Sequence, residues 1–178
     1  MDNVIGRIAA QAERYRIAAP FGVFAAFLFF VVSATPVLAT PFGIAKTDDL
    51  LFGSFVAGIG GTVTIAPSSG ARSAIGVTLI NSTFRAASFS VSCSADVCTT
   101  GSRYTFALPL DNTAALSGPG DSMYLTSFMA YSVGKGNSAE GRLVGDSDTL
   151  KVGATLNVEG NQAPGSYTGS FTLTVNYP

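Results

Sequence analysis

The sequence predicts an all-β protein: an immunoglobulin-like β-sandwich preceded by a helical signal segment. Short stretches in which apolar and polar residues alternate recur after residue 39, and Gly, Pro, Ser and Asn separate them. The chain of 178 residues is 47% hydrophobic but only 12% charged, a composition typical of exported β-rich modules. The roughly 139 residues after position 39 suit one sandwich domain of this kind.

The first forty residues have the pattern of an export signal. Three arginines precede an apolar run over 21–34, and small residues follow that end in V-L-A. We therefore expect residues 1–39 to be a signal peptide that is cleaved after Ala39, with Ala34 as a second possible site. An uncleaved anchor is the alternative, because residues 17–34 are apolar enough just to cross a bilayer.

The alternating runs after the signal predict eight or nine strands. In order, they cover residues 49–58, 61–67, 72–80, 88–93, 103–109, 122–131, 150–160 and 166–177. Each run places its apolar side chains on one face, as expected of a strand with one buried side. The face residues of four runs are Val63 and Ile65; Ile75, Val77 and Leu79; Phe89, Val91 and Cys93; and Tyr104, Phe106 and Leu108.

Both cysteines, Cys93 and Cys98, lie in the exported part of the chain. An oxidising compartment favours a disulfide between them, and the loop between them is short. We expect the bond to staple a local turn. A metal site is not expected, because the chain has no histidine and no further cysteine to complete a ligand set.

The composition contains little that could carry out chemistry. Without histidine, acid–base catalysis would depend on scattered carboxylates, and Asp121, Asp146 and Asp148 have the neighbours of solvated turn residues. A calcium site at 145–148 is a weak alternative. The net charge of −1 provides no basic field for nucleic acid. We expect neither an enzyme nor a cofactor nor a nucleic-acid partner.

The end of the sequence has the features of a strand that pairs with a partner. Gly165 is the fourteenth residue from the end, Tyr177 is the penultimate residue, and the apolar Phe171, Leu173 and Val175 alternate between them. This pattern resembles the carboxy-terminal signature of pilins of the bacterial chaperone–usher pathway. The resemblance implies that this edge strand is recognised by a periplasmic chaperone.

Three stretches are similar to a family of bacterial secreted proteins, domain-of-unknown-function family 4402. They are residues 50–73, residues 152–171 and the closing T-V-N-Y. The resemblance implies a pilin-like sandwich over 50–178 on the surface of a Gram-negative bacterium, and it brings no assigned activity. Two features depart from the expected pattern: the cysteine pair, and the short segment before Leu50.

That short segment, residues 40–49, is the predicted N-terminal extension and the candidate donor strand. In donor-strand assembly, an extended segment of one subunit fills a groove in the next. Phe42 and Ile44 stand at alternate positions, as the side chains that fill such a groove would. The alternative is that 40–49 folds back as an ordinary first strand of its own domain.

These observations predict a structural subunit of a surface fibre. Its expected partners are copies of itself or related pilins, a periplasmic chaperone and an outer-membrane usher. The protein would pass through the periplasm to the cell surface or the medium, and only its signal segment would contact the membrane. The alternative is a monomeric secreted or anchored β-sandwich that binds carbohydrate or protects the envelope.

Overall fold

The structure, a computed structural model, describes residues 42–93, 98–136 and 139–177. The predicted signal segment and its cleavage site at Ala39 lie outside the described residues. Within them no helix is able to cross a membrane. All named strands pair antiparallel, so the predicted all-β class is confirmed.

The described part of the chain contains twelve strands, whereas the sequence predicts eight or nine. They are β1 (Phe42–Asp48), β2 (Phe55–Val56), β3 (Gly60–Ile65), β4 (Arg72–Ile75), β5 (Thr78–Leu79), β6 (Ala87–Cys93), β7 (Arg103–Ala107), β8 (Ala115–Leu116), β9 (Met123–Ser132), β10 (Glu140–Arg142), β11 (Ser147–Glu159) and β12 (Thr174–Asn176).

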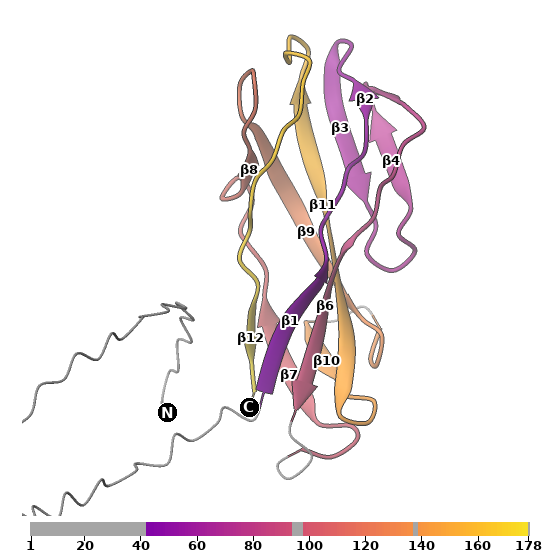
Figure 1. The fold of residues 1–178 in the computed structure, drawn as a ribbon, viewed down its shortest axis with the longest axis vertical. Coiled ribbons are helices and arrows are strands. Elements are labelled where there is room, and N and C mark those ends of the chain that lie inside the picture. The colour runs from indigo at the N-terminus through magenta and orange to yellow at the C-terminus, as the bar shows by residue number, and fades with distance from the viewer. Residues whose placement is uncertain (1–41, 94–97, 137–138, 178) are drawn as a thin grey trace, which may run out of the picture. The chain divides into compact units, whose positions relative to one another are not determined.

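A seven-stranded sheet is built around β11, a strand of 13 residues (Figure 1). One edge of β11 pairs with β9, which in turn pairs with β8. The other edge pairs with β6 over Ser147–Val152 and with β3 over Thr155–Glu159. Beyond these two neighbours lie β1, on β6, and β4, on β3. The sheet therefore ends in two separate edges on that side, and β1 is one of them.

The layer that faces this sheet is continuous over only part of its length. A three-stranded sheet in the order β10-β7-β12 lies at the end of the molecule where β1 and β6 are (Figure 1). Between the two sheets is a buried cluster that includes Val91, Tyr104, Leu143 and Leu150. Toward the other end, the facing layer consists of the short pair β2-β5 and of segments without a continuous ladder.

The predicted core positions are largely confirmed. Val63, Ile65, Val91 and Tyr104 are each 0% exposed, because alternation places every second side chain of a strand on the buried face. Ile75 is a correction, since its side chain is 77% exposed. The run 72–80 is not one strand, and its two parts, β4 and β5, belong to different sheets.

Candidate functional site

An open groove lies between the two end segments of the described chain, and we call it the seam. Its walls are residues 48–58 on one side and 162–171 on the other, and its volume is about 1070 Å³. The floor is the large sheet, which contributes apolar side chains of β6, β9 and β11, among them Phe89, Leu125 and Leu156. In Figure 1 the two walls are the segment that leads from β1 to β2 and the segment that leads to β12.

Among the described residues, the wall 162–171 pairs with another strand-like segment on its outer side. Thr168 and Ser117 exchange both of their backbone hydrogen bonds, at 2.8 and 3.0 Å. In a strand, the polar groups of successive residues point to opposite sides, so those of Tyr167 and Gly169 are directed away from Ser117. Neither residue has a backbone hydrogen bond in the described structure. An unpaired strand edge therefore faces the seam.

The opposite wall has the same one-sided pairing. Leu51 and Arg85 exchange backbone hydrogen bonds at 2.9 and 3.0 Å, on the side away from the seam. The neighbouring Leu50 lines the groove, and its backbone has no hydrogen bond among the described residues. No described ladder or bridge connects 42–58 with 162–177. The seam is thus bordered by two strand-like edges that do not pair with each other.

Arg72 fixes the conformation of the 48–58 wall. Its guanidinium donates hydrogen bonds to the carbonyl oxygens of Phe52, at 3.0 Å, and of Ile80, at 2.7 Å. The same group lies 4.6 Å from the centre of the Phe84 ring, within the range of a cation–π contact. This wall is therefore held to β4 and to the segment after β5.

The three apolar residues between Gly165 and Tyr177 in the predicted edge strand all pack toward the core, as the alternation in the sequence predicts. Phe171 packs against one core cluster, and Leu173 and Val175 pack against the other. Gly165 has a φ of +151°, and a Cβ there would lie 2.5 Å from Pro119, so a side chain would not fit. Recognition of these residues by a chaperone stays a prediction.

Tyr177 lies beyond the lining of the seam, near the start of β1. Its ring stacks on that of Phe42, with centroids 4.6 Å apart and an interplanar angle of 21°. This contact joins the end of the β12 segment to the start of β1, although the two strands form no ladder. Tyr177 is still 45% exposed. This aromatic stack therefore connects the two chain segments that continue from the walls, outside the seam itself.

The candidate donor segment is folded into its own domain. Phe42–Asp48 forms β1, which pairs with β6 at six positions. This is the arrangement that the alternative for 40–49 expects. Phe42 is partly buried, whereas Ile44 is 45% exposed. Its use as a donor strand stays a prediction.

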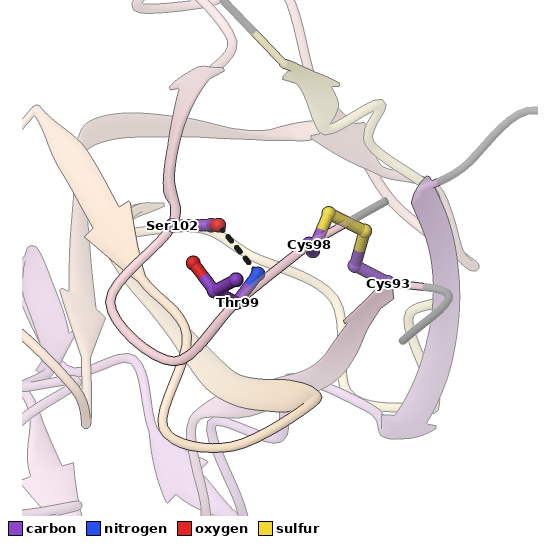
Figure 2. Close-up of a disulfide and its surroundings, with 4 residues drawn as sticks. All are labelled: Cys93, Cys98, Thr99 and Ser102. Atoms are coloured by element: carbon purple, nitrogen blue, oxygen red, sulfur yellow. Dashed lines mark hydrogen bonds between the residues drawn. A yellow bond between two sulfur atoms is a disulfide. The ribbon is translucent and has the colours of Figure 1, made fainter. Parts of the chain in front are cut away.

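The two cysteines form the predicted disulfide, Cys93–Cys98 (Figure 2). The bond ties the end of β6 to the segment that leads into β7. Beyond it, the Thr99 amide donates a hydrogen bond to the Ser102 hydroxyl at 3.1 Å, which shapes the following turn. Both cysteines belong to the core cluster between the two sheets.

Replacing both cysteines by serine should lower the free energy of unfolding by about 2 kcal/mol, because the loop that the bond closes in the unfolded chain is short. We expect the circular dichroism spectrum to be unchanged. Urea denaturation of the variant and of the oxidised wild type measures the difference. A variant as stable as the wild type would show that the disulfide does not restrain the unfolded chain.

A buried polar cluster connects the two sheets and was missed by the sequence interpretation. The Asp148 carboxyl group, on β11, accepts a hydrogen bond from the Tyr104 hydroxyl of β7 at 2.6 Å. It also accepts hydrogen bonds from the Ser132 hydroxyl, at 2.5 Å, and from the Gly134 amide, at 2.9 Å. Asp148 is only 5% exposed, so the expectation of a solvated turn carboxylate was wrong.

The cluster is suited to holding the sheets together. Burial, and after it the hydrogen bond to Asp148, raises the pKa of the Tyr104 phenol well above its usual range, so the hydroxyl remains a donor. Asp146, the other carboxylate of the weak calcium alternative, is exposed on the neighbouring turn. The part of the chain that the structure describes contains no group of three His, Cys, Asp or Glu side chains that could hold a metal ion.

Comparison with known proteins gives one result. The family model described as "Domain of unknown function (DUF4402)" matches residues 42–177, which include every described strand. No curated protein and no solved structure matches the chain. The match carries no pilin signature, so that part of the resemblance remains a prediction. Because this family model matches most of the length of the chain, the chain belongs to the DUF4402 family.

Proposed function

We propose that the protein is a structural subunit of a bacterial surface fibre, in which a strand from a neighbouring subunit fills the seam. The observation that supports this proposal best is the groove itself: an apolar floor between two strand-like edges whose inner sides have no backbone partner among the described residues. An inserted strand would bury these backbone groups, which would then require hydrogen-bond partners, and it would supply them to one wall or to both.

The dimensions of the seam suit a strand. A strand rises about 3.3 Å per residue, with neighbours about 4.8 Å apart and facing sheets about 10 Å apart, so each residue takes up about 160 Å³. A groove of about 1070 Å³ is thus large enough for a short strand of several residues. A strand with alternating side chains would cover the apolar floor and use the free backbone edges, and a compact ligand would leave the edges unpaired.

The proposal extends to the complete fold and to the cellular route. With the added strand, the facing layer would run the length of the large sheet and complete an immunoglobulin-like sandwich. Open edges invite aggregation, so we propose that a periplasmic chaperone covers the seam until an outer-membrane usher brings two subunits together. The fibre would then be displayed on the cell surface.

The alternative is a monomeric secreted or anchored module, and one observation favours it. β1 pairs with β6 of its own chain and covers that edge without a second copy. A self-sufficient module would leave the seam for a ligand, such as a carbohydrate. The two functions differ in whether the exported protein is found as filaments or as single copies.

Immunoelectron microscopy of the producing cells tests the proposal. An antibody raised against the described domain should label thin filaments at regular intervals along their length. Label that is confined to the envelope, together with single copies in the medium, would contradict the fibre proposal and support the monomeric module.

A further inference from the structure

The place of β1 argues against Phe42–Asp48 as the strand that fills a neighbour's seam. β1 covers the edge of β6 through six paired positions, and Phe42 packs on the core cluster and on Tyr177. Moving β1 into another copy would fill one groove and leave the edge of β6 uncovered. A donor that lies ahead of β1 adds pairing without this loss.

On the basis of the proposed fibre function, we propose that the donor is Thr35–Pro41 of a neighbouring copy, and that the signal is cleaved after Ala34. Cleavage there leaves Thr35–Pro41, seven residues, ahead of β1. This is the length of a short strand, which the seam is large enough to hold. Cleavage after Ala39 would leave only Thr40 and Pro41, too few to fill the groove.

The chemistry of Thr35–Pro41 suits the seam. The segment T-P-V-L-A-T-P has no charged residue, as an apolar floor requires, whereas β1 carries Lys46 and Asp48. The residue before a proline is restricted to extended conformations, so Thr35 and Thr40 favour a strand. The prolines lack an amide donor, but they stand near the two ends of the segment, and the residues between them keep theirs.

A second copy is required because the same chain cannot place this segment correctly. Thr35–Pro41 joins β1 at Phe42, ahead of Lys46, where the lining of the seam begins on this side. To enter its own seam it would have to reverse direction, and a tight turn takes about two residues. The five that remain would lie beside β1, short of the wall 48–58.

The first test is the intact mass of the full-length protein after export. We expect a mature chain that begins at Thr35. A chain that begins at Thr40 or at Met1 would overturn this inference and leave the fibre proposal standing, since assembly could then use another donor.

The second test is crosslinking between copies with a short bismaleimide. Val37→Cys is combined with Ser166→Cys or Ser170→Cys. Both serines are exposed and line the seam, and cysteine is close to serine in size. Ile44→Cys replaces Val37→Cys as the matched control for the β1 donor. We expect crosslinked dimers with Val37→Cys and their loss with Ile44→Cys.

The remaining outcomes separate the two proposals. Dimers with Ile44→Cys alone would overturn the assignment of Thr35–Pro41 but keep strand exchange. Crosslinks within single copies would show that the segment fills its own seam, which overturns the inference. Absence of crosslinks for both donors, in a protein that stays monomeric, would overturn the fibre proposal as well.

Discussion

Replacing Asp148 by alanine is expected to lower the free energy of unfolding by about 3–5 kcal/mol. The carboxyl group accepts hydrogen bonds from Tyr104, Ser132 and the Gly134 amide, and without it these three donors lose a buried partner. The Tyr104 donor comes from β7, in the other sheet, so the loss weakens the connection between the sheets.

Urea denaturation followed by circular dichroism measures this effect. Asp146→Ala is the matched control, because Asp146 is exposed two residues away, and we expect a change below about 0.5 kcal/mol. Tyr104→Phe keeps the ring and removes one donor, so its effect should lie between those of the two alanine variants. Equal stability of the Asp148 and Asp146 variants would show that the cluster contributes no net stability.

Filling the seam with a large side chain is expected to abolish filaments while the domain stays folded. Ala57 lies in one wall and Ser170 in the other, and an indole at either position would occupy the space of the inserted strand. Ala57→Trp and Ser170→Trp should therefore prevent strand insertion. Ala71→Trp, at an exposed position on the turn between β3 and β4, is the control and should assemble normally.

Electron microscopy of the exported variants and their circular dichroism spectra provide the comparison. Two wall positions are used because a change that unfolds the domain would also remove filaments. Normal filaments from either folded wall variant would show that the seam does not receive the connecting strand.

Local alternation predicted the strands well where one face of a strand is buried along its whole length. Val63, Ile65, Val91 and Tyr104 are core residues for this reason. The prediction was wrong at Ile75, because Gly76 has a φ of +78° and redirects the chain, so that the next strand joins another sheet. The presence of Gly76 within the alternating run 72–80 was not enough to predict this bend from the sequence.

The polar cluster and the seam depend on contacts between distant parts of the chain. Asp148 stands in the sequence G-D-S-D like a turn residue, and only the register of β11 places it opposite Tyr104. The run 166–177 has the pattern of a full strand, yet only Thr174–Asn176 is assigned as one. A strand pattern that lacks part of its ladder is what a missing neighbour would leave.

Hydrogen exchange at the backbone amides of Tyr167 and Gly169 tests strand insertion most directly. Both lie in the wall 162–171, and neither has a backbone hydrogen bond in the single copy that the structure describes. In assembled protein, a strand in the seam should slow the exchange of at least one of these amides, while the Thr168 amide, already bonded to Ser117, changes little. Equal exchange of Tyr167 and Gly169 in assembled and single copies would contradict the insertion of a strand into the seam.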